Sequence, residues 1–148
     1  MDEKFTDCHK ISLAVTVANG AAGTSAIQGA ILDMSGFDKI AVMVTFGAIV
    51  SNAVTSFKVE QSDASDMSGS EDIAGSNQTV ADTKDGKIFL SDMVRPTKRY
   101  IRLLVSRATQ NATLVAHYIQ GGADNKPVTQ SSDVAATEGF KDAAGGTA

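Results

Sequence analysis

The sequence predicts an all-β domain, a two-sheet β-sandwich of the jelly-roll type with about eight strands. From residue 11 onward, short apolar stretches rich in β-branched residues alternate with clusters of Gly, Ser, Asn and Asp. These stretches begin about 8–12 residues apart, which is typical of sandwiches and barrels. Helix signals are weak. One helical turn is expected at 70–74, where Ser70 could cap Glu71 and Asp72.

Eight stretches have the length and composition of strands. In chain order they are 11–18, 25–32, 39–46, 54–61, 78–81, 87–90, 99–105 and 113–119. The stretch 39–46 (KIAVMVTF) is apolar on both faces, which is typical of a central strand that is covered on both sides. Its second face is expected to lie against a loop of the same chain or against a neighbouring subunit.

Two of the strands show which face is buried, because successive side chains of a strand point to opposite faces. In 54–61, one face carries Phe57 and Val59, and the other carries Ser56, Lys58 and Glu60. In 100–105, one face carries Ile101, Leu103 and Val105, and the opposite, mixed face carries Tyr100, Arg102 and Leu104. Strand 54–61 is therefore expected to have one face exposed to solvent.

The two ends of the chain differ from its centre. Residues 1–10 are charged and without a period, so they are expected to form an extended N-terminal arm. Residues 121–148 are rich in Ala, Gly, Ser and Asp, and Phe140 is their one large apolar residue after Val134. Such a tail cannot bury enough surface to fold alone, so it would be disordered or lie over another surface. Residues 11–120 form the predicted sandwich domain.

Composition excludes several functional classes. The 148 residues suit one domain, and a net charge of −4 gives no general attraction to nucleic acid. No apolar run approaches the roughly 20 residues of a membrane-spanning helix, and residues 1–10 are too polar for a signal peptide. A single cysteine excludes an internal disulfide framework.

No catalytic, metal or cofactor site is predicted. Nucleophilic catalysis needs a nucleophile beside a base, yet the chain has no G-x-S-x-G motif and two histidines. Cys8 and His9 are adjacent and lack zinc-ligand spacing, and His117 lies in a predicted strand. The acidic run 60–72 fails the EF-hand pattern, which leaves a looser Ca²⁺ site or, preferably, a solvated loop that caps its own turns. Residues 20–23 lack the features of a phosphate-binding loop.

Charge is distributed unevenly, and this predicts an interface. Segment 95–107 holds five of the 13 basic residues and no acid, whereas 60–72 holds five carboxylates and no base. The candidate interface residues are Arg95, Lys98, Arg99, Arg102, Asp63, Asp66, Glu71 and Asp72, with Phe140 from the tail. Complementary charges of this kind would fix a contact within the fold or between subunits. The alternatives are a solvated basic edge and a nucleic-acid site, for which Tyr100 is the one available stacking residue.

Several stretches resemble capsid cement or decoration proteins of tailed bacteriophages. They are FDKIAVMVTFG (37–47), FKVEQSDASD (57–66), RPTKRYIRLLVSRATQNATLVAHYIQGGADNKPV (95–128) and the opening arm running into ISLAVTV. The third is the most specific, because RPTKRYIR, a strand, the turn ATQNAT, a second strand and a closing KPV resemble the C-terminal hairpin of that group. The resemblance covers most of 11–128, and the tail beyond Val128 departs from it.

The resemblance implies a non-enzymatic virion protein without cofactors. It would sit on the outer capsid as a homodimer or homotrimer, bridge major capsid protein subunits and stabilise the shell, without contacting nucleic acid or membrane. Assembly would take place in the cytoplasm of the bacterial host, which suits a chain without cysteine pairs. Another virion component, such as a tail or head-fibre protein, is the alternative. A carbohydrate-binding module would need exposed aromatics, and the chain has no Trp and two Tyr.

Overall fold

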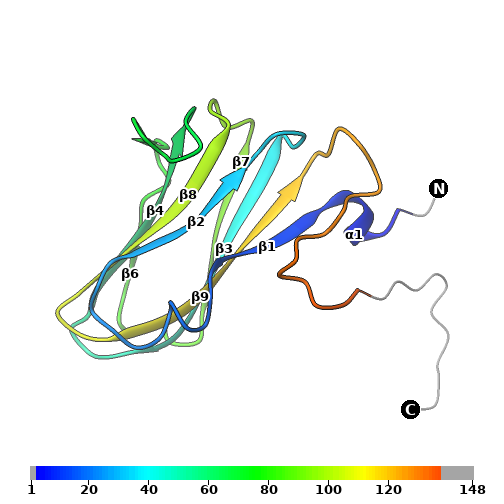
Figure 1. Ribbon diagram of the computed structural model, residues 1–148. Coiled ribbons are helices and arrows are strands. Elements are labelled where there is room, and N and C mark those ends of the chain that lie inside the picture. Colours follow the sequence, from blue (N-terminus) through cyan, green and yellow to red (C-terminus); the bar gives the residue numbers. More distant parts are fainter. Residues whose placement is uncertain (1–2, 138–148) are drawn as a thin grey trace, which may run out of the picture.

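Two antiparallel sheets pack face to face in the computed structural model, which describes residues 3–137 (Figure 1). The first, here the β3 sheet, has the order β1 (Lys10–Val15), β9 (Ala112–Gly121), β3 (Lys39–Ile49) and β7 (Ile88–Val94). The second, the β8 sheet, has the order β2 (Ile27–Asp33), β8 (Tyr100–Ala108) and β4 (Val54–Ser62). Beyond β4, the short strands β5 (Glu71–Asp72) and β6 (Gln78–Val80) both pair with it.

Consecutive long strands lie in opposite sheets, as they do in a jelly roll. The prediction of a two-sheet sandwich is confirmed, and each of the eight predicted strands overlaps an observed one. Strand β7 continues past the predicted 87–90 because Ser91 and Asp92 interrupt the apolar run without ending the pairing with β3.

The predicted helical turn at 70–74 is wrong, because Glu71 and Asp72 form β5. They pair with Gln61 and Glu60 of β4. The Ser70 hydroxyl does not cap a helix but donates to the Glu60 carboxylate, at 3.1 Å between Oγ and Oε2. Pairing with β4 thus replaces the local hydrogen bonds that the helical turn would have supplied.

The core lies between the sheets and follows the predicted alternation. Phe57 and Val59 of β4 are buried, as are the inner residues of β8, which are Ile101, Leu103 and Val105. Phe89 of β7 packs edge-on against Phe46 and Phe57, with ring centroids 5.6 and 5.9 Å apart. Glu60, expected on the solvated face, is 6% exposed. It is covered because Arg102 lies beside it.

The two faces of β3 are buried to different extents, although both were expected to be covered. The strand is central, between β9 and β7, as predicted. Its inner face is fully buried, and its outer residues Ala41, Met43 and Thr45 are half-buried. The outer residues of the neighbouring β7 are largely exposed, so no described residue covers that end of the face.

The two ends of the described chain lie beside β1 and contact each other (Figure 1). The predicted N-terminal arm contains one helical turn, α1 (Phe5–Cys8). Residues 126–133, here the C-terminal strap, run past it: the Val128 N–H donates to the Asp7 carbonyl at 3.0 Å. No helix within residues 3–137 is long and apolar enough to cross a membrane.

The C-terminal strap also covers the free edge of β1. The side-chain oxygen of Gln130 accepts the Ile11 N–H, and the Asp133 carboxylate accepts the Leu13 N–H, both at 3.0 Å. An edge strand is prone to unwanted pairing when its backbone groups are free. Side chains of the strap therefore protect this edge without adding a strand.

Candidate interaction surfaces

Five of the charged residues singled out in the sequence form ion pairs on the outer side of the β8 sheet; they are Lys98, Arg99, Arg102, Glu71 and Asp72. Strand register places Arg102 of β8 opposite Glu60 of β4. Their side chains form an ion pair that is 17% and 8% exposed, and the Arg102 Nε lies 2.7 Å from the Glu60 carboxylate. The pair is satisfied on both sides, because Ser70 also donates to Glu60.

Three further ion pairs surround this one and are more exposed. Lys58 contacts Asp72 at 2.8 Å, and Lys98 contacts Glu71 at 3.5 Å. Two parallel hydrogen bonds of 2.9 and 2.8 Å join Arg99 to Asp33. Hydrogen bonding to Arg99 lowers the pKa of the Asp33 carboxyl, and the carboxylate raises the pKa of Arg99.

The basic segment and the acidic run thus meet within one chain. Lys98 with Glu71 and Arg102 with Glu60 pair across the two segments. Asp72 pairs with Lys58 and Arg99 pairs with Asp33, partners that lie outside both segments. Arg95, Asp63 and Asp66 form no ion pair within residues 3–137, and Phe140 lies outside the described residues. An interface role for these residues stays a prediction.

Within the acidic run, only residues 63–70, which connect β4 to β5, form a loop, and its local hydrogen bonds fit the solvated-loop interpretation. The Ser62 hydroxyl accepts the Ala64 N–H at 3.0 Å and donates to the Ser68 carbonyl at 2.7 Å. Asp66 accepts the Ser68 N–H, and this hydrogen bond lowers the pKa of the Asp66 carboxyl. In the described part of the chain, no three His, Cys, Asp or Glu side chains lie together as metal ligands would.

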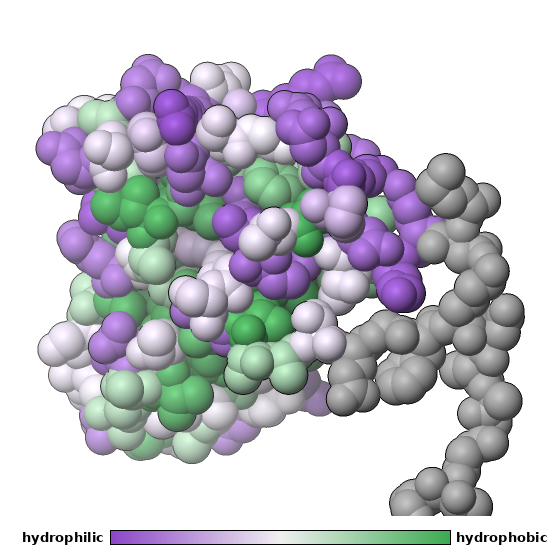
Figure 2. Space-filling model, turned by 45° about the vertical axis from the view of Figure 1, so that its right-hand side comes forward, coloured by the Kyte–Doolittle hydropathy of each residue, from purple (hydrophilic) through white to green (hydrophobic). Residues whose placement is uncertain are grey.

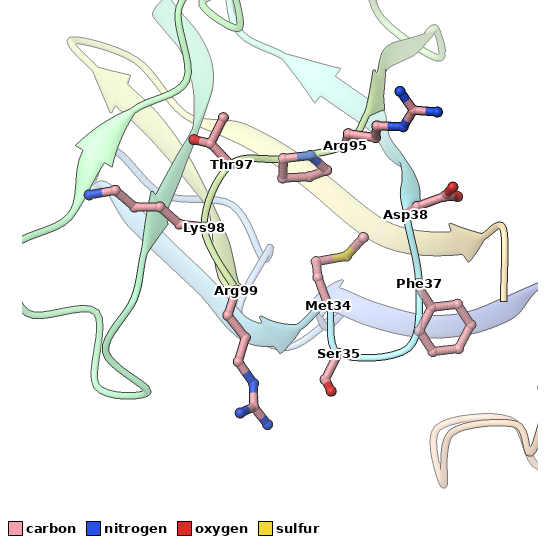
Figure 3. Close-up of a pocket in the computed structure, with 9 residues that line it drawn as sticks. Met34, Ser35, Phe37, Asp38, Arg95, Thr97, Lys98 and Arg99 are labelled. Atoms are coloured by element: carbon pink, nitrogen blue, oxygen red, sulfur yellow. The ribbon is translucent and has the colours of Figure 1, made fainter. Parts of the chain in front are cut away.

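A hollow of about 360 Å³ lies between the turn after β2 and the segment 95–99. Figure 3 shows the charged ends of Arg95, Lys98 and Arg99 pointing in different directions. A small-molecule site needs a few polar groups that converge on the ligand. The hollow therefore lacks the geometry of an anion site.

The outer side of the β3 sheet is apolar, and we call it the apolar face. Its residues are Ile11 and Leu13 of β1, Val115, His117 and Ile119 of β9, Ala41, Met43 and Thr45 of β3, and Ile88, Leu90 and Val94 of β7. At one end the same side also carries two charged residues, Asp92 opposite Ala41 and Lys39 opposite Val94. Ile88, Leu90 and Val94 are 59%, 59% and 62% exposed. Figure 2 shows hydrophobic patches on the body of the sandwich, with many hydrophilic residues at the upper end.

Two details extend the apolar face. A groove of about 480 Å³ opens at one end, lined mostly by apolar and small residues that include Val17, Thr45, Gly47 and Val115. His117 lies near the centre, paired in register with Met43 and Leu13, and its Nδ1 atom is buried without a hydrogen-bond partner. The face is thus mainly apolar over four strands, with the His117 ring near its centre and Asp92 at its β7 edge.

Arg107 has a structural role that the sequence reasoning missed. It is 8% exposed, and its guanidinium donates to the carbonyls of Ala21, Ser25 and Ala112 at 2.7–2.8 Å. Loss of solvation lowers its pKa. The signal was present, because Arg107 continues the buried alternation of Ile101, Leu103 and Val105 by one further step.

Comparison with solved structures supplies the remaining finding. No family profile matches the chain, and no curated protein matches it in sequence. PBSX exported protein XepA matches with a TM-score of 0.53 and 18% identity over 96% of this chain and 46% of XepA. SPBc2 prophage-derived protein YomS matches with a TM-score of 0.46 and 14% identity over 75% of this chain and 92% of YomS. These structural neighbours are phage-derived proteins. The chain shares its fold with part of XepA and spans a little under half of XepA's length.

Proposed function

We propose that this chain is a non-enzymatic component of a phage particle, one that binds the outer capsid and stabilises the shell by bridging major capsid protein subunits. The apolar face carries the proposal. Soluble monomers rarely expose large contiguous apolar surfaces, and such surfaces mark interaction sites. The sequence resemblance to cement proteins and the fold shared with a phage-derived protein support the same assignment.

Binding through this face needs no cofactor and no catalytic group. Burial of apolar surface stabilises a complex by roughly 25 cal/mol per Å². The four strands form a rigid surface, so little conformational entropy is lost when they bind. Each contact can be weak, because a shell offers many copies of the site and linked contacts act together. Major capsid protein and further copies of this chain are the proposed partners, with no nucleic-acid or membrane partner.

The test uses purified expanded shells that lack the protein. Added wild-type protein should co-sediment with the shells and raise their melting temperature. Met43→Glu and Thr45→Glu place a carboxylate within the apolar face, and both variants should bind at least tenfold more weakly. Val54→Glu is the matched control, because Val54 is 62% exposed on the other sheet. Shells that neither bind the protein nor gain stability from it would refute the proposal.

The neighbour XepA is described as an exported protein, and this favours a second candidate, a phage component that acts away from the capsid. A tail protein would belong to this class, whereas a head-fibre protein would fractionate with the heads. Fractionation of purified particles into heads, tails and released protein separates the two candidates. Recovery with heads supports the cement function, and recovery with tails or in the medium supports the second candidate.

A further inference from the structure

Strand β7 is the outermost strand of the β3 sheet, and the hydrogen bonds around it show which way its backbone points. The Lys87 carbonyl accepts the Phe46 N–H, and the Arg95 N–H donates to the Asp38 carbonyl, so both residues point toward β3. Backbone direction alternates along an antiparallel strand. The N–H and C=O groups that point away from β3 therefore belong to Ile88, Leu90, Asp92 and Val94.

This row of backbone groups is almost unpartnered. The Leu90 carbonyl accepts a hydrogen bond of 3.0 Å from the Gln78 side chain. The other N–H and C=O groups of the row have no partner within residues 3–137. The side chains of Ile88, Leu90 and Val94 continue the apolar face at this edge, and each is more than half exposed.

The other described edges of the sandwich are protected by means that proteins commonly use. The C-terminal strap covers β1. Strand β2 has an irregular register between Gln28 and Ile31. The edge beyond β4 consists of β5 and β6, which are two and three residues long. Strand β7 has seven residues, continuous pairing with β3 and an outer row in which three of four residues are apolar, so it is the edge best suited to accept another strand.

We infer that β7 pairs antiparallel with β7 of a second copy of this chain, which joins two four-stranded sheets into one of eight strands. Antiparallel pairing of a strand with itself is two-fold symmetric, so the contact closes as a dimer and does not propagate. A two-fold axis at Leu90 sets the two Leu90 residues opposite each other at the centre of the contact and Ile88 opposite Asp92. An axis at Asp92 would set two carboxylates opposite each other and is disfavoured.

The size of the contact sets its strength. Seven strand residues at about 3.4 Å each give a strip about 24 Å long, which is narrow compared with the roughly 1,200 Å² or more that stable complexes bury. The dimer is therefore weak and concentration-dependent in solution. The inference extends the proposed function, because the pair presents one apolar face from two chains. Its test uses isolated protein, so capsid binding and dimerisation can fail separately.

The test measures molar mass by sedimentation equilibrium from about 1 μM to about 1 mM, the range in which a weak contact responds to concentration. Wild-type protein should shift from monomer toward dimer. Leu90→Lys places a charge in the contact and should stay monomeric. Leu90→Pro should also stay monomeric, although it removes no bond to β3, because the Leu90 N–H points away from that strand. Val54→Lys should dimerise as the wild type does.

Hydrogen exchange gives a second measurement that does not depend on the proline variant folding. The amides of Leu90 and Asp92 should exchange several-fold more slowly in concentrated than in dilute wild-type protein, and Leu90→Lys should abolish the difference. A wild-type mass that stays monomeric at the highest concentration would overturn the inference. A Leu90→Lys variant that dimerises as well as the wild type would also overturn it.

Discussion

The hydroxyl oxygen of Tyr118, in the β3 sheet, lies 2.8 Å from the backbone nitrogen of Leu103 in the β8 sheet. The same hydroxyl donates to the Ala30 carbonyl of β2 at 2.7 Å. Strands β2 and β8 lose regular pairing between Gln28 and Ile31, which leaves backbone groups there without a ladder partner. The phenol crosses the core and completes this interrupted ladder.

Tyr118→Phe should destabilise the fold by about 1–3 kcal/mol, because the buried Leu103 N–H and Ala30 carbonyl would both lose their partner. Denaturant unfolding monitored by circular dichroism measures the change. Tyr100→Phe is the control, since the Tyr100 hydroxyl makes no hydrogen bond within the described residues. Equal stabilities of the two variants would contradict the role given to the phenol.

Stability should fall with alkaline pH, and Tyr118 should account for part of that fall. Burial raises the pKa of Tyr118 well above the ordinary value of 10.0. Above pH 10 the unfolded chain releases the phenolic proton while the folded chain keeps it, so the unfolding free energy decreases as pH rises. The contribution approaches about 1.4 kcal/mol per pH unit. Tyr118→Phe should have a shallower decline between pH 10 and 11 than Tyr100→Phe, measured by urea unfolding.

The buried pair of Arg102 and Glu60 should matter more than the exposed pair of Arg99 and Asp33. Arg102→Ala leaves a carboxylate buried without its cation and should cost about 3 kcal/mol. The double replacement Arg102→Leu with Glu60→Leu should cost less than Arg102→Ala, because no charge is left unpaired. Arg99→Ala should unfold close to wild type, since exposed pairs contribute little. Equal losses from Arg99→Ala and Arg102→Ala in denaturant unfolding would show that burial does not distinguish the pairs.

Removal of the strap's carboxylate should expose β1 without unfolding the sandwich. Asp133→Ala takes away the acceptor of the Leu13 N–H, and that amide should exchange about tenfold faster. Asp124→Ala removes the same charge from an exposed position just before the strap and should leave the exchange of Leu13 unchanged. Loss of the whole fold in Asp133→Ala, seen as collapse of protection in β3 and β9, would contradict a purely edge-covering role.

The long strands could be predicted from the sequence because the alternation of apolar and polar residues lies within each strand itself. Ile101, Leu103 and Val105 alternate with polar or mixed neighbours, and that alternation alone assigns the buried face of β8. Strand β5 could not be found in this way. Its two residues, Glu71 and Asp72, have no pattern, and they are extended because β4 offers a free edge.

The candidate surfaces were less predictable because they depend on register between distant segments. The sequence indicates that Arg102 and the acidic run carry opposite charges, but the pairing with Glu60 requires β8 and β4 to align residue by residue. A shift of one residue would send Arg102 to the other face. The sequence predicted the apolar face only at 39–46. It did not predict the exposed apolar row of β7, because the polar Ser91 and Asp92 interrupt that stretch.

The C-terminal strap joins the two ends of the described chain through non-covalent contacts. Lys126 reaches Glu3 at 3.0 Å, and Gln130 donates to the Thr6 carbonyl at 2.9 Å. A force that pulls the two ends of the chain apart would act on these contacts first. It would act on the hydrogen bonds between strands only after these contacts had broken. Under force, the contacts between the C-terminal strap and the N-terminal arm should therefore break first, while both sheets of the sandwich are still folded.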